Sequence, residues 1–175
     1  KEIDAVGGEM ALAIDETGIH YKMLNKSKGP AVWAPRAQAD KKNYQLRMKE
    51  VLEKQKNLTI VQDIVERIIV EGNQIKGITT IRGQHHVAKA VILCTGTFLQ
   101  GLIHIGNYNE KAGRLGDFSA EMLSDSLKEL GFPVKRLKTG TPPRVNGNSI
   151  DFNKCEIQQP DSVPTPFSYR TKSID

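Results

Sequence analysis

The sequence has few cysteines and no long hydrophobic run. Cys94 and Cys155 are its only cysteines, too few and too widely spaced for a disulfide framework. No uninterrupted apolar run is longer than residues 90–94, which have the length of a strand, whereas a membrane-spanning helix needs about 20 apolar residues. We therefore expect a protein of the reducing cytoplasm that is not inserted in a membrane.

An apolar leader and an initiator methionine are also lacking. The chain opens with Lys1-Glu2-Ile3-Asp4, which predicts no signal peptide and indicates that upstream sequence is missing. With 38% hydrophobic and 26% charged residues, the 175 residues have the composition of an ordinary soluble protein. Their number fits one domain with part of a second.

Periodicity predicts three helices. Apolar residues recur at helical spacing over residues 1–13, with an interruption at Gly7-Gly8, and again over residues 38–54. A third helix is expected over residues 119–131, where Gly131 provides a stop. Residues 19–24 are expected to be extended.

Short β-rich runs separated by Gly and Asn turns form the clearest pattern in the chain. They predict an antiparallel meander whose strands cover residues 58–61, 66–70, 75–81 and 86–88. The apolar run 90–94 follows and predicts a strand covered on both faces, in which Cys94 is a packing residue. A glycine-rich loop over residues 101–116 and a strand over residues 134–137 complete the expected elements.

The apolar run ends at Thr95-Gly96-Thr97. Glycine lacks a Cβ, so the backbone here can approach a ligand closely, and ligands of α/β sheets bind beyond the carboxyl ends of strands. The alternative is an ordinary glycine between a strand and a loop. The preceding meander favours a cofactor contact. No metal site is predicted, because the adjacent strand residues His85 and His86 point to opposite faces.

A basic segment runs from Pro133 to Arg144 in a chain of net charge +5. It contains no acidic residue and four basic ones, Lys135, Arg136, Lys138 and Arg144. One interpretation is contact with the phosphates of RNA, because phosphate contacts dominate the affinity of nucleic-acid binding. The other is a rigid hinge at a domain boundary, formed by the Thr-Gly-Thr-Pro-Pro sequence. Both remain open.

Five segments resemble, in order, segments of the MnmG/GidA family of flavin-dependent tRNA-modifying enzymes. They are SKGPAV (27–32), RAQAD (36–40), GTFLQGLIHIG (96–106), GRLGD (113–117) and RLKTGTPPR (136–144). The resemblance implies an α/β fold, a partial Rossmann-like three-layer FAD-binding domain with an antiparallel meander. It assigns this domain to residues 1–145 and the start of an inserted domain to residues 146–175.

The resemblance also implies contacts with FAD. Val65 matches the residue whose backbone pairs with adenine, and we expect Val65 and the Thr95–Thr97 turn to flank one groove. The family has a serine contact at the position of Ala120, so either Ser119 makes that contact or it is absent. The loop Lys28, Gly29, Pro30 and Ala31 is expected between a strand and a helix, near the flavin ring; its alternative is a surface turn.

The activity implied is the formation of 5-carboxymethylaminomethyluridine at wobble uridine 34 of tRNA. The resemblance also implies FAD as the cofactor, NADH and methylenetetrahydrofolate as co-substrates, and a homodimer that works with the GTPase MnmE. The family's G-x-G-x-x-G turn and catalytic cysteines lie outside this chain, so we expect an internal fragment that is inactive alone. The rivals are a folate- and FAD-dependent tRNA uridine methyltransferase and a non-catalytic RNA-binding module.

Overall fold

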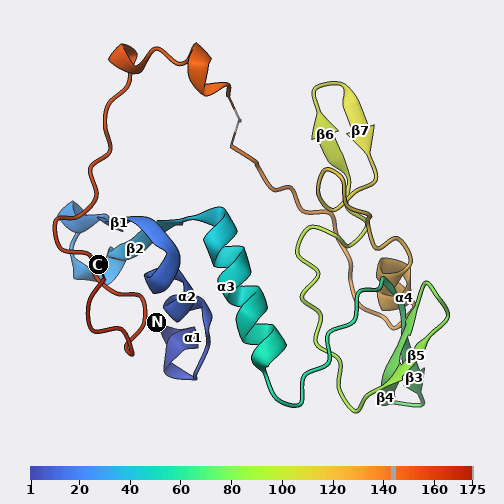
Figure 1. Cartoon of the computed structure of the whole chain (residues 1–175). Coiled ribbons are helices and arrows are strands. Elements are labelled where there is room, and N and C mark those ends of the chain that lie inside the picture. Colours follow the sequence, from blue (N-terminus) through green and yellow to red (C-terminus); the bar gives the residue numbers. More distant parts are fainter. Residues whose placement is uncertain (143–144, 175) are drawn as a thin grey trace. The chain divides into compact units, whose positions relative to one another are not determined.

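A computed structural model describes residues 1–142 and 145–174 (Figure 1). The chain divides into two compact units, one formed by residues 1–60 with residues 145–174, the other by residues 61–142. In the described ranges, no helix has the length and hydrophobicity required to cross a bilayer. The predicted domain boundary at residue 145 concerns the organisation of the whole protein and stays a prediction.

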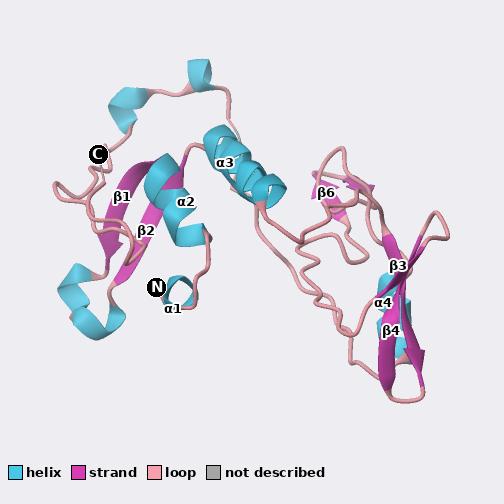
Figure 2. Cartoon of the chain, turned by 60° about the horizontal axis from the view of Figure 1, so that its bottom comes forward, coloured by secondary structure: helices cyan, strands magenta, loops and turns pink. Residues whose placement is uncertain are grey.

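The first unit combines three helices with a hairpin. Its elements are α1 (Glu2–Ala5), α2 (Met10–Thr17), β1 (Gly18–Leu24), β2 (Ala34–Ala39) and α3 (Lys41–Lys54). Strands β1 and β2 are antiparallel, with Tyr21 opposite Ala37, and α2 contacts α1, α3 and β2 (Figure 2). The predicted interruption at Gly7-Gly8 is confirmed, since it separates α1 from α2.

Helix α3 begins later than predicted. Asp40 caps it, because its carboxylate accepts hydrogen bonds from the backbone N–H groups of Lys42 and Asn43, both at 3.0 Å. Residues 38 and 39 instead pair with β1 as part of β2. The prediction that residues 28–31 connect a strand to a helix is therefore wrong, since they connect two strands.

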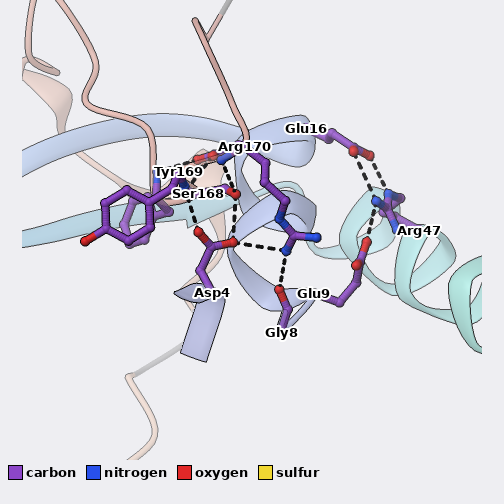
Figure 3. Close-up of polar contacts among 10 residues, drawn as sticks. Asp4, Gly8, Glu9, Glu16, Arg47, Ser168, Tyr169 and Arg170 are labelled. Atoms are coloured by element: carbon purple, nitrogen blue, oxygen red, sulfur yellow. Dashed lines mark hydrogen bonds and ion pairs between the residues drawn. The ribbon is translucent and has the colours of Figure 1, made fainter. Parts of the chain in front are cut away.

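A buried carboxylate fixes the C-terminal segment to the first unit (Figure 3). Asp4 is 6% exposed and accepts hydrogen bonds from the Ser168 hydroxyl (2.7 Å), the Tyr169 backbone N–H (2.7 Å) and the Arg170 guanidinium (3.0 Å). These bonds, led by that from the Tyr169 backbone, lower the pKa of Asp4 to about 2. The charged form is thus the one that the fold stabilises.

Two further aspartates hold the same segment. The Asp15 carboxylate accepts from the backbone N–H groups of Phe167 (2.8 Å) and Ser168 (2.9 Å). Asp161 accepts from the Met23 backbone (2.7 Å) and from the Lys26 ammonium (2.8 Å), and the lysine contact lowers its pKa. We call residues 158–170, held at these points, the C-terminal strap.

Arg47 joins α3 to the helix before it. Its guanidinium donates to the carboxylates of Glu9 and Glu16 at the two ends of α2 (Figure 3). Paired hydrogen bonds from a planar guanidinium fix geometry more firmly than a single ammonium contact. The angle between α2 and α3 therefore depends on this residue.

The second unit contains the predicted meander. Strands β3 (Val65–Glu71), β4 (Gln74–Thr80) and β5 (His85–Val87) form one antiparallel sheet in the order β3-β4-β5. Helix α4 (Leu123–Glu129) packs against β3. The core consists of Ile68, Leu123 and Leu127, with Val65, Val70, Ile75, Leu99 and Val134 packed against it.

Polar contacts align α4 with the sheet. The Ile68 backbone N–H donates to the buried hydroxyl of Ser126 at 3.1 Å, which gives a buried backbone group a partner. Arg67 and Glu129 form an ion pair at 2.5 Å on the exposed side of the same contact. The buried bond contributes more to stability, because exposed ion pairs are screened by solvent.

Three predicted strands are wrong. Residues 58–61, 90–94 and 134–137 are irregular, Ile92 is 87% exposed, and Cys94 is exposed rather than packed. A strand needs a neighbour to satisfy its backbone groups, and no described residue pairs with these segments. An apolar run alone does not supply that neighbour.

The region after residue 100 also differs from the prediction. The expected loop over residues 101–116 contains a hairpin of β6 (Ile103–Ile105) and β7 (Tyr108–Glu110) that turns at Gly106, where φ is +59°. Helix α4 is shorter than predicted, although its expected stop at Gly131 is confirmed by a φ of +87°.

Replacing Asp4 should make the contacts of Ser168–Arg170 less sensitive to acid. Because the folded pKa of Asp4 is lower than the unfolded value of about 3.9, its stabilisation is complete above that value and is lost as the pH falls toward 2. We expect Asp4→Asn to weaken the strap at neutral pH and to remove the part of its pH dependence between about pH 4 and 2 that comes from Asp4, while the part that comes from Asp161 stays. NMR of the Ser168–Arg170 amides measures this.

The matched control is Asp151→Asn, which removes a partly exposed carboxylate outside the Asp4 contact. Equal amide shifts in the two variants between pH 4 and 2 would show that Asp4 does not hold the strap.

Candidate functional site

Several of the predicted cofactor residues lie together at one corner of the second unit. Leu99 forms a parallel bridge with Ala120, in which Ala120 N–H donates to Phe98 O (2.8 Å) and Gln100 N–H donates to Ala120 O (2.9 Å). The Ser119 hydroxyl donates to Phe98 O at 3.2 Å. We call residues 95–100 with residues 119–120 the nucleotide corner. Ser119 and Ala120 are thereby placed beside the Thr95–Thr97 turn.

A side-chain hydrogen bond stabilises this corner. The Thr97 hydroxyl donates to Gly113 O at 2.6 Å, which ties the turn to the GRLGD segment. Gly113 is buried, and a Cβ built there would collide with the Phe98 ring. The packing of Phe98 therefore explains why a glycine is required at this position.

Gly96 has the conformation and the surroundings that close approach of a ligand requires. Its φ is +55°, a left-handed value that favours glycine, and a Cβ built on it would meet nothing within 4 Å. The residue is exposed. The open backbone face supports the predicted role of the Thr95-Gly96-Thr97 turn, which stays a prediction.

Val65 lies at the start of β3, opposite Thr80. It is partly buried and packs against the same core as Leu99, so the predicted adenine contact and the nucleotide corner share one unit and one core. Its backbone pairing with adenine stays a prediction.

An open apolar groove of about 690 Å³ lies in the second unit. It is lined by Ile68, Ile75, Val91, Leu93, Leu99, Leu127, Leu130, Phe132, Pro133, Val134, Lys135 and Leu137. The predicted cofactor residues are not among these lining residues, whereas the basic residue Lys135 is. The groove can accept apolar groups but offers little for the recognition of a phosphate.

The loop predicted near the flavin ring lies in the first unit. Lys28 is exposed, and Gly29, with a φ of +92°, joins two short 3-10 turns, Lys26–Lys28 and Pro30–Val32. The indole N–H of Trp33 donates to Lys26 O at 3.3 Å and closes the loop. Contact of Lys28, Gly29, Pro30 and Ala31 with flavin stays a prediction.

The basic segment is exposed at Lys135, Arg136 and Lys138. Arg144, the fourth predicted RNA contact, lies outside the described residues, as does Pro143. Arg136 differs from the two lysines in making a specific contact, since both of its terminal nitrogens donate to the backbone oxygen of Gln100 at 3.1 Å.

Gln100 is not among the residues predicted from the sequence. Its φ is +43°, and its side-chain amide donates to Glu121 O at 3.1 Å, just beyond Ala120. A non-glycine residue in a left-handed conformation persists only where surrounding contacts impose it. No pattern in the sequence identifies such a residue, because the contacts that impose its conformation come from residues 20 or more positions away.

Metal-ligating side chains do not gather in the part of the chain that the structure describes. Among those residues no cluster of three or more His, Cys, Asp or Glu side chains is placed to hold an ion. Cys94 and Cys155 are free thiols on the surface.

Known proteins match the chain over its whole length. The family described as Glucose inhibited division protein A matches residues 1–175. The tRNA uridine 5-carboxymethylaminomethyl modification enzyme MnmG of Thermodesulfovibrio yellowstonii is 54% identical over 175 residues, and that of Bacillus subtilis is 53% identical over 171 residues, 98% of this chain. The chain spans 28% of the length of the first relative and 27% of the second.

The structure has the same fold as a solved relative. GidA from Aquifex aeolicus superposes with a TM-score of 0.90 at 51% identity, covering 98% of this chain and 28% of that one. The predicted fold class, a partial α/β FAD-binding domain carrying a meander, is confirmed by this likeness.

Removal of the Thr97 hydroxyl should loosen the nucleotide corner. A net hydrogen-bond contribution of about 1 kcal/mol corresponds to roughly fivefold faster exchange of the nearby amides, including that of Ala112, in Thr97→Val. Thr95→Val is the matched control, because it makes the same change two residues away. Hydrogen exchange followed by NMR measures the difference, and equal rates in the two variants would contradict the assigned role.

Proposed function

The chain belongs to the Glucose inhibited division protein A family, and from that membership we propose that its protein is a flavin-dependent tRNA-modifying enzyme. The reaction is the formation of 5-carboxymethylaminomethyluridine at wobble uridine 34. The observation that carries the proposal is identity of 54% across all 175 residues with a relative named for this modification. Such identity, without a gap in coverage, supports the same chemistry better than a likeness of fold alone would.

FAD is the proposed cofactor, and residues of the second unit are proposed to hold part of it. The Thr95-Gly96-Thr97 turn offers open backbone to the dinucleotide, and Val65 offers its backbone to adenine. The Ser119 hydroxyl already bonds to Phe98 O within the nucleotide corner. Because a serine hydroxyl has one proton to donate, a bond donated by Ser119 to FAD would replace that contact. We therefore assign Ser119 and Ala120 to shaping the nucleotide corner.

The first unit is proposed to contribute the loop of Lys28, Gly29, Pro30 and Ala31. Flavin, when bound, supplies hydride transfer to a one-carbon unit. The exposed Lys28 ammonium would stabilise negative charge on a flavin ring bound beside it. Because the 175 residues lack a G-x-G-x-x-G turn, tight binding of FAD is not expected from this chain alone.

The co-substrates and partners of the whole protein belong to the same proposal. They are NADH, methylenetetrahydrofolate, glycine or ammonium, tRNA, the GTPase MnmE and a second copy of the protein, acting in the cytoplasm. Lys135 and Lys138 support the tRNA assignment, since both are exposed and carry charge that suits phosphate. Residues 146–175 are proposed to begin a second, inserted domain.

Complementation tests the proposal. The full-length protein is expressed in a bacterium that lacks its own MnmG, with the Bacillus subtilis enzyme as positive control and an empty vector as negative control. We expect mass spectrometry of digested tRNA to show 5-carboxymethylaminomethyluridine restored at the wobble position. Methylation of a T-loop uridine instead would favour the rival methyltransferase, and unmodified tRNA bound without flavin would favour an RNA-binding module.

A further inference from the structure

We infer that Arg136 is a positioning residue for the nucleotide corner, not a phosphate contact like its basic neighbours. The inference rests on the proposed function and assigns different tasks to residues of the same basic segment. Arg136 fixes the backbone conformation at Gln100, whereas Lys138 contacts a phosphate of tRNA.

The geometry at Gln100 carries the first step. Two terminal nitrogens of Arg136 donate to one backbone oxygen, each at 3.1 Å, so the guanidinium straddles the Gln100 carbonyl. Hydrogen bonds from a charged donor are roughly twice as strong as neutral ones. A lysine ammonium offers no equivalent planar pair of donors.

The second step is the conformation that this bond stabilises. At a φ of +43°, Gln100 is in a region that non-glycine residues rarely occupy. Three contacts oppose its relaxation: its N–H donates to Ala120 O, its side chain donates to Glu121 O, and its carbonyl accepts from Arg136. Strained backbone of this kind concentrates at functional sites.

The third step connects Gln100 to the predicted cofactor residues. Gln100 directly follows Leu99, whose bridge to Ala120 defines the nucleotide corner, and the Thr95-Gly96-Thr97 turn ends two residues before Leu99. Rotation of the Gln100 peptide would therefore move both sides of the corner. Loss of the Arg136 bond should therefore disturb the predicted FAD contacts of the nucleotide corner, because only a few backbone bonds separate them from Gln100.

Lys138 provides the contrast within the segment. It is exposed and lies two residues from Arg136, with the same formal charge. A phosphate contact made by Lys138 would change the salt dependence of tRNA binding without altering the backbone at Gln100.

The experiment compares Arg136→Ala, Arg136→Lys and Lys138→Ala in the full-length protein. Titration of the flavin-free proteins with FAD gives the dissociation constant, and tRNA binding at several salt concentrations gives the slope of log affinity against log salt. We expect FAD binding to weaken about tenfold in Arg136→Ala and part of the way in Arg136→Lys, with the salt slope retained. In Lys138→Ala we expect unchanged FAD affinity and a slope smaller by about 1.

A double variant guards against a general loss of folding. Gln100→Gly removes the backbone strain and the side-chain bond, so adding Arg136→Ala to it should weaken FAD binding by much less than tenfold. Additive effects in this cycle, or an Arg136→Ala protein with wild-type FAD affinity and a reduced salt slope, would overturn the inference. A wild-type full-length protein that takes up no FAD would instead contradict the proposed function.

Discussion

The backbone pairing of Phe98–Gln100 with Ala120 is the contact on which the second unit depends. It closes the loop of residues 101–119 just before α4 begins. Helix α4 then packs Leu123 and Leu127 against Ile68 of β3. Each backbone bond contributes only about 1 kcal/mol net, and the cost of closing a loop grows slowly with its length. A few bonds at this point therefore suffice to organise a long irregular segment.

The first unit is held together differently, by hydrogen bonds to aspartate carboxylates. The carboxylates of Asp4 and Asp15 accept hydrogen bonds from the backbone N–H groups of residues 167–169 in the C-terminal strap. A buried carboxylate is tolerated only when it is bonded on several sides, and Asp4 meets that condition with Ser168 and Arg170 as well. Contacts so distant in sequence make residues 145–174 part of the unit that begins at Lys1.

Local sequence predicted the strands correctly where neighbouring strands are joined by a short turn with a glycine. The meander was predicted because Gly72 and Gly83, at φ values of +60° and +74°, mark its two turns and β-branched residues fill its strands. The run 90–94 failed because a strand covered on both faces requires partners that hydrophobicity alone does not reveal. The β6–β7 hairpin was missed since its glycine-rich surroundings indicated only a loop.

The candidate site was predictable only in part. Gly96 follows from its place after an apolar run, and Val65, Ser119 and Ala120 came from the family resemblance rather than from any local pattern. Gln100 was not predictable. Its left-handed backbone is imposed by Ala120, Glu121 and Arg136, and only the folded chain brings these groups together.

The central claim, that β3 and the nucleotide corner hold FAD together, is tested most directly by hydrogen exchange of the full-length protein with and without the cofactor. We predict slower exchange on FAD binding in peptides that cover Val65, residues 95–100 and residues 113–120. The β6–β7 hairpin should exchange at the same rate in both states. Unchanged exchange at Val65 and at residues 95–100 in a protein that carries FAD would show that these residues do not hold the cofactor.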